Sequence, residues 1–149
     1  MARGDLTLFE ELTDQLGEKG HNFSSDTLKL GIVDNTLTPL DSIETPTWSD
    51  YSANEVTDAG GYVTGGIALT GVTWSEVDGV STLDDSGNIS LAQDALGFTD
   101  GYWGILYNDT NATKMAVAFV DLGGPVSEQD GPININWGAS GIFKLTKVA

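Results

Sequence analysis

The sequence predicts a mainly β protein, an antiparallel β-sandwich or barrel with a short N-terminal helix or arm. Three observations support this prediction. From residue 26 onward, apolar residues recur at every second position in several short segments, which is the period of a half-buried strand. Turn residues separate those segments, and nineteen glycines suit a turn-rich architecture. At 149 residues, the chain has the usual size of one domain.

The N-terminal residues follow a helical period instead. Thr7 and Glu10 have the spacing of a capping box, and Gly17 supplies a stop, so we expect a short amphipathic helix over 5–17. Such a short helix is marginal alone and must pack against either the chain's own core or a neighbouring subunit. Residues 1–25 therefore form an N-terminal helix or arm, and residues 26–149 form one β-rich domain. The apolar residues predicted to contact a partner are Leu8, Phe9 and Leu12.

Short strands and turns account for the rest of the chain. The Asp78-Gly79 pair lies between apolar residues, which is a strong signal for a two-residue hairpin turn. Residues 34–61 form the longest irregular connection, with one short edge strand over 48–56. A loop is expected from Gly123 to Pro132. We expect strands in the segments 27–33, 67–74, 89–91, 103–107, 115–119, 133–137 and 141–148.

The charge balance narrows the choice of partner. The chain has 22 acidic and 6 basic residues, a formal net charge of −16, and no cation between Lys29 and Lys114. Nucleic acid is not an expected partner, because phosphate binding needs clustered Lys and Arg. The acidic surface either confers solubility alone or favours docking onto a basic protein. No apolar segment reaches the roughly 18 residues of a membrane span, and no secretory signal is evident, so no membrane partner is expected.

Residues for bond-making chemistry are sparse. The chain has no cysteine and one histidine, His21, which lies in a polar link where a solvent-exposed, inactive side chain is expected. The acidic run at Asp84 and Asp85 resembles a calcium loop but lacks the ligand order of an EF-hand, so a plain turn is expected. We therefore predict no catalytic residues, no metal and no cofactor. A hydrolase that uses two carboxylates remains an alternative.

The four tryptophans are the most informative aromatic residues. Trp103 and Trp137 lie in alternating segments and are expected in the core. Trp48 lies beside Tyr51 in the Thr-rich connection, where it either packs over the edge of the core or contacts a partner, because aromatic anchors are enriched at interfaces. Trp48 and Tyr51 therefore join the predicted partner-binding residues.

Several segments together resemble small proteins encoded among the head and tail genes of tailed bacteriophages. These segments are GDLTLFEE (4–11), DTLKLGIV (26–33), TWSDY (47–51), GYWGILYND (101–109) and ININW (133–137). The resemblance implies a virion structural protein. Within that class we expect a capsid decoration or cement protein, assembled in the host cytoplasm as a homotrimer and bound to the major capsid protein on the outer surface of the shell. Another head-tail or tail component and a carbohydrate-binding β-sandwich are the alternatives.

Overall fold

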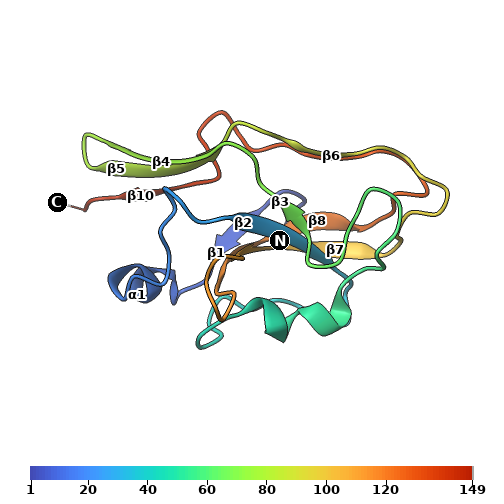
Figure 1. Cartoon of the computed structure of the whole chain (residues 1–149), viewed down its shortest axis with the longest axis horizontal. Coiled ribbons are helices and arrows are strands. Elements are labelled where there is room, and N and C mark those ends of the chain that lie inside the picture. The colour runs from blue at the N-terminus through green and yellow to red at the C-terminus, as the bar shows by residue number, and fades with distance from the viewer. Residues whose placement is uncertain (149) are drawn as a thin grey trace.

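The structure, a computed structural model, describes residues 1–148 and confirms a mainly β fold of antiparallel sheets. Two layers of strands pack as in a sandwich, and within the described residues they do not close into a barrel (Figure 1). The strands are β1 (Leu6–Leu8), β2 (Leu28–Val33), β3 (Ile67–Ala68), β4 (Val72–Val77), β5 (Val80–Asp85), β6 (Ile89–Leu91), β7 (Gly101–Asn108), β8 (Ala116–Val126), β9 (Ile133–Ile135) and β10 (Phe143–Thr146). One α-helix, α1 (Leu12–Gly17), and two 3₁₀ turns, η1 (Trp48–Asp50) and η2 (Ser52–Asn54), complete the described elements.

The first layer is a five-stranded sheet with the strand order β1-β8-β7-β2-β3. At its centre, Leu30 of β2 pairs with Leu106 of β7, and Leu106 pairs with Ala118 of β8. At one edge, Leu6 of β1 pairs with Val120, so the start of the chain joins a strand more than a hundred residues away. This long-range pairing makes the N-terminal segment the edge strand of the sheet.

The second layer consists of the sheet β10-β5-β4 and the two-stranded ribbon β6-β9. It runs above the five-stranded sheet in Figure 1. The Asp78-Gly79 hairpin is confirmed, because Val77 pairs with Val80 across the turn and both central residues have positive φ (+53° and +82°).

Apolar side chains between the two layers form the main core. Leu28, Leu30 and Ile32 of β2 are fully buried and alternate along the strand, as the sequence predicts. The second layer contributes Leu83 and Phe143 from the opposite side. The remaining large members include Phe23, Tyr62, Leu91, Phe98, Leu106 and Val120.

A second core lies on the other face of the five-stranded sheet, under residues 34–56, which we call the cover. The cover, drawn in turquoise with its short turns, crosses below the sheet in Figure 1. The Trp48 ring packs directly over Gly31, where a Cβ atom would overlap the indole. The sheet is therefore buried on both faces. The residues of this core are Phe9, Val33, Trp48, Tyr51, Ile105, Tyr107, Ala116 and Phe119.

Three local predictions are wrong. The expected helix over 5–17 is a strand, β1, followed by a helix that begins only at Leu12. The expected edge strand over 48–56 is a pair of 3₁₀ turns, with a single bridge from Glu55 to Val33. The loop expected at Gly123 is instead the last part of β8, which continues to Val126.

Candidate functional site

The sandwich is open along one side, and a cavity of about 420 Å³ lies there. We call this opening the seam. Its lower wall is the upper face of β8 with Leu6 of β1, and its upper wall is β9 with the chain leading into β10. The apolar residues that line the seam are Leu6, Val120, Leu122, Val126, Ile133, Ile135 and Ile142.

Both walls of the seam end in strand edges that have no neighbour among residues 1–148. β1 is the terminal strand of its sheet, and β9 pairs on one side only, with β6. Six consecutive residues, 133–138, line the cavity. Because successive side chains of a strand point to opposite faces, a consecutive run indicates that β9 presents its backbone edge to the seam.

The register of β1 shows which backbone groups face outward. Phe9 N–H donates to Val117 C=O, and Asp121 N–H donates to Asp5 C=O, so residues 5, 7 and 9 make the bonds to β8. Hydrogen-bonding alternates along an antiparallel strand. The N–H and C=O groups of Leu6 and Leu8 therefore point to the free edge.

Polar groups border the mouth of the seam. Arg3 is exposed and is the one basic residue among those that line the cavity, while Asp121 is the one acidic residue. Trp137 is fixed in the upper wall because its indole N–H donates to Asp85 Oδ2 at 3.2 Å. The seam thus combines an apolar interior with a small, nearly neutral polar rim.

The structure places the predicted partner-binding residues inside the molecule, with one exception. Phe9 and Leu12 are each 1% exposed, in the second and main core respectively. Tyr51 is also 1% exposed, and burial, with a contribution from Asp50, raises the pKa of its hydroxyl to about 12. Trp48 is 6% exposed and stacks on Tyr107 with ring centroids 4.9 Å apart. Only Leu8, which is half-buried in β1, lies at a free edge.

The burial of these side chains limits the contacts that they can make with a partner. Neither Trp48 nor Tyr51 presents an exposed ring on which a sugar can stack. Contact between the four buried side chains and a partner would require the core to open, so that part of the hypothesis stays a prediction. Trp103 and Trp137, expected in the core, are half-buried and pack against the second and main core.

His21 is not the exposed loop residue that the sequence suggests. Its ring is buried and stacks on Phe23 with centroids 5.2 Å apart. Nε2–H donates to Gln15 Oε1 at 2.8 Å, and Nδ1 accepts from Asn108 Nδ2 at 3.2 Å. Because these partners fit the neutral ring, protonation would set Nδ1–H against the Asn108 amide. Burial lowers the pKa of His21 to about 4, although the charge of Asp26 opposes the shift.

The His21 environment predicts a loss of stability in mild acid. The folded protein releases the imidazole proton at lower pH than the unfolded chain, so the unfolded chain binds more protons between about pH 6.5 and 4. The free energy of unfolding therefore falls through this window and is unaffected by His21 above it. We expect a contribution of about 1–2 kcal/mol after solvent screening. Urea unfolding at pH 7 and 4.5 measures it, and His21→Gln should show a smaller pH dependence than the natural chain. Equal pH dependence of the two proteins would contradict the prediction.

Asp84 and Asp85 are the last residues of β5, and the chain bends after them at Ser86 and Gly87. Asp85 is 8% exposed, and its Oδ1 accepts from Gly87 N–H at 2.9 Å while its Oδ2 accepts from Trp137. Residues 1–148 contain no group of three or more His, Cys, Asp or Glu side chains placed to hold a metal ion. Nor does this part of the chain contain a helix long and apolar enough to cross a membrane.

Two carboxylates, one buried and one half-buried, hold a glycine-rich loop against the sandwich, and nothing in the sequence pattern singles them out. Glu128 is fully buried, and its Oε1 accepts from Gly61 N–H at 2.7 Å. Glu55 Oε1 accepts from Tyr62 O–H and from Gly65 N–H, each at 2.7 Å. Gly61, Tyr62 and Gly65 all belong to the loop that leads into β3, so both carboxylates fix this loop.

Comparison of the chain with protein-family models, with curated proteins and with solved structures finds no match in any of the three.

Proposed function

We propose that this chain is a structural protein of a tailed-phage virion that decorates the outer surface of the capsid and stabilises the shell. It acts by adhesion to the major capsid protein, as a homotrimer, and the proposal assigns it no catalytic step. The observation that carries the proposal is the placement of its charge. The resemblance of five segments to phage head and tail proteins supports the assignment to the virion.

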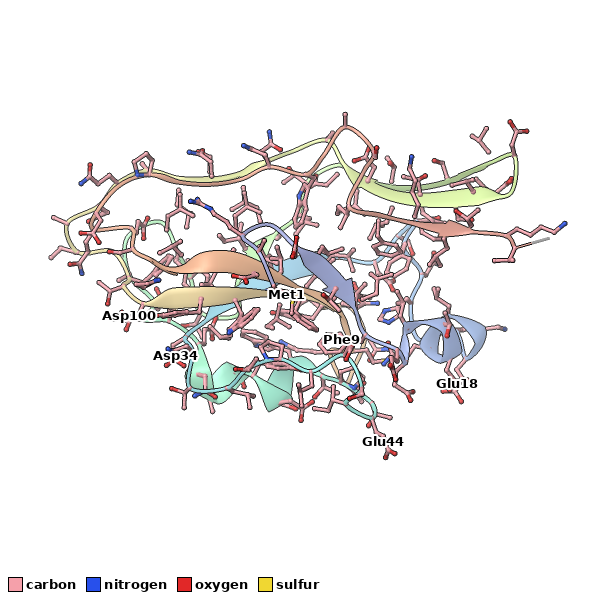
Figure 2. The ribbon with its side chains drawn as sticks, turned by 180° about the vertical axis from the view of Figure 1, so that it is seen from behind. Met1, Phe9, Glu18, Asp34, Glu44 and Asp100 are labelled. Carbon is pink, nitrogen blue, oxygen red and sulfur yellow. The ribbon has the colours of Figure 1, made fainter. Side chains whose placement is uncertain are left out.

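The negative charge lies on the surface, and little of it is neutralised within the chain. Among the described residues, the ion pairs join Asp109 to Lys29 and to Lys114, at 3.0 and 3.1 Å. The cover has no cation, and Figure 2 shows Glu44 on its outer side, pointing away from the sheet. Asp41 and Asp50 are exposed on the same segment. A surface of one sign attracts a basic partner and repels the packaged DNA, which suits a position outside the shell.

Copy number in purified particles tests the assignment. Fractions of the native source are separated by sedimentation, and the chain is quantified by mass spectrometry beside the major capsid protein. We expect it in virus-sized particles at a copy number comparable with that of the capsid subunits. Absence from the particles would refute the virion assignment. Labelled protein located on tails by electron microscopy would instead identify a tail component.

Charge on the cover is expected to contribute to capsid binding. Asp41→Asn with Glu44→Gln removes two exposed charges that make no side-chain hydrogen bond or ion pair among the described residues. At about 0.5 kcal/mol for each exposed charge, we expect roughly fivefold weaker binding to particles stripped of this protein, at low salt. Asp78→Asn with Asp130→Asn is the matched control, because it removes the same charge from other exposed loops. Equal weakening by both pairs would show that the cover has no special role.

A further inference from the structure

We propose that the seam binds an extended strand of a positively charged partner protein, which pairs with the free edges of β1 and β9 and places apolar side chains in the cavity. This inference rests on the proposed function and deepens it, because it names the site at which the chain binds its partner and the kind of partner segment that binds there. The observation behind it is that two unpaired strand edges border one apolar cavity.

The backbone of the seam selects an extended peptide. Leu6 and Leu8 direct N–H and C=O groups to the free edge of β1, and β9 presents its edge across Ile133–Ile135, after which the chain continues along the cavity to residue 138. Edge strands with unpaired groups are templates for an added strand. β1 and β9 have three residues each, which span about 10 Å, so each edge can pair with about three residues of the partner segment.

The interior of the seam selects alternating apolar side chains. Val120 and Leu122 form its floor, and Ile133 and Ile135 line the opposite wall. The cavity of about 420 Å³ falls in the range, roughly 300–1,000 Å³, of sites that enclose several ligand groups. Only every second side chain of an added strand can point inward. The partner segment should therefore carry an apolar residue at every second position.

Net charge favours a basic foreign protein over a second copy of this chain as the occupant of the seam. Two copies, each with a formal charge of −16, repel each other, so contacts between copies in the proposed homotrimer have to offset this repulsion, whereas contacts with a basic partner do not. A basic protein is attracted to the same surface at long range, and the seam itself presents only Arg3 and Asp121 as charged groups. The net charge of the whole molecule then attracts the partner at long range. Backbone pairing and apolar packing in the seam determine which segment binds.

A random nine-residue peptide library, selected against the full-length chain, tests the proposal. We expect the selected peptides to alternate apolar and polar residues and to carry net positive charge. Gly138→Trp adds bulk at the seam, where a Cβ atom meets nothing within 4 Å. Gly131→Trp is the matched control, because its Cβ is equally free and it does not line the seam. The loss of a few hydrogen bonds should weaken binding about tenfold or more in Gly138→Trp, and leave Gly131→Trp unchanged.

Hydrogen exchange supplies a second readout that does not depend on the variants. Bound peptide should slow exchange of the outward Leu6 amide, whereas the Thr7 amide, already bonded to β8, should change little. Peptides that bind both glycine variants equally, or that leave Leu6 unprotected, would overturn the proposal. So would a dimer or trimer of the natural chain that Gly138→Trp converts to monomer, since the occupant would then be a second copy.

The two proposals fail in different ways. If the chain is absent from virus-sized particles but selects basic alternating peptides at the seam, the virion assignment is wrong and the strand-binding site stands. If the chain is abundant in particles and Gly138→Trp binds stripped particles as tightly as Gly131→Trp does, the strand-binding inference is wrong and the virion assignment stands.

Discussion

Replacing Trp48 by alanine is expected to lower the free energy of unfolding by about 3–5 kcal/mol, as for other large buried aromatic residues. The indole is 6% exposed, stacks on Tyr107 and fills the space over Gly31. Its loss leaves a cavity between the sheet and the cover and removes one of the apolar contacts, beside those of Tyr51 and Ile43, that hold the cover in place. Urea unfolding at neutral pH measures the change.

Ser52→Ala is the control for Trp48, because Ser52 is exposed on the same cover and makes no side-chain hydrogen bond. It should change stability by less than about 0.5 kcal/mol. The comparison also separates a packing role of Trp48 from a binding role. A Trp48→Ala protein with natural stability and weakened partner binding would show that the ring leaves the core to make a contact.

Gly66→Ala should be one of the most damaging small substitutions in the chain. Gly66 has φ of +80°, and a Cβ atom there would lie 2.5 Å from Leu30 O and 2.7 Å from Gly31 N. The left-handed conformation costs a side chain about 1–2 kcal/mol, and the backbone of β2 cannot move without breaking its pairing with β7. We expect a total loss of about 3–4 kcal/mol in the free energy of unfolding.

Substitution of the neighbouring glycine, Gly65, distinguishes the cost of the left-handed backbone conformation from the cost of the close contact with β2. Gly65 has φ of +87°, but its Cβ would meet only the Tyr107 hydroxyl, at 3.7 Å. Gly65→Ala therefore carries the conformational cost alone, about 1–2 kcal/mol. The difference between the two variants, measured by chemical denaturation, is the cost of the close approach to β2. If both lose the same stability, crowding at Gly66 contributes nothing.

Local signals in the sequence are sufficient for several elements. The Asp78-Gly79 turn is specified by two residues whose preference for positive φ requires no distant contact. The alternation of Trp103, Ile105 and Tyr107 correctly predicts β7. It does not reveal that Gly104 and Leu106 are buried as well. These two residues face the main core, whereas the alternating residues face the second core under the cover, which is an irregular segment without a period of its own.

Elements that depend on distant partners are predicted less well. Thr7 and Glu10 have the spacing of a helical capping box, whereas Leu6 and Leu8 alternate as in a strand. A segment of three residues is too short to distinguish the helical period of about 3.6 from the strand period of about 2. The outcome is decided by pairing of Thr7 with Phe119, which no local pattern shows. His21 is similar: its partner Asn108 lies 87 residues away, so its burial is invisible in the sequence.

The seam was not predictable either. Ile133, Ile135 and Trp137 indicate a strand, but not that its outer edge has no neighbour. Nothing local shows that β1 and β9 end their layers on the same side. Openness of a sandwich is a property of strand order, and strand order depends on pairings between segments far apart in the chain.

The pairing of β1 with β8 also bears on how the protein is made. The partner of Leu6 is Val120, so the five-stranded sheet cannot be completed until most of the chain has left the ribosome. At a synthesis rate of about 5–20 residues per second, the segment of β1 stays unpaired for several seconds or longer, with Leu6 and Leu8 exposed to water. Non-local strand pairing of this kind also slows folding once synthesis ends. Nascent chains are thus most exposed to aggregation before β8 emerges, and a chaperone that binds the N-terminal segment would act during that interval.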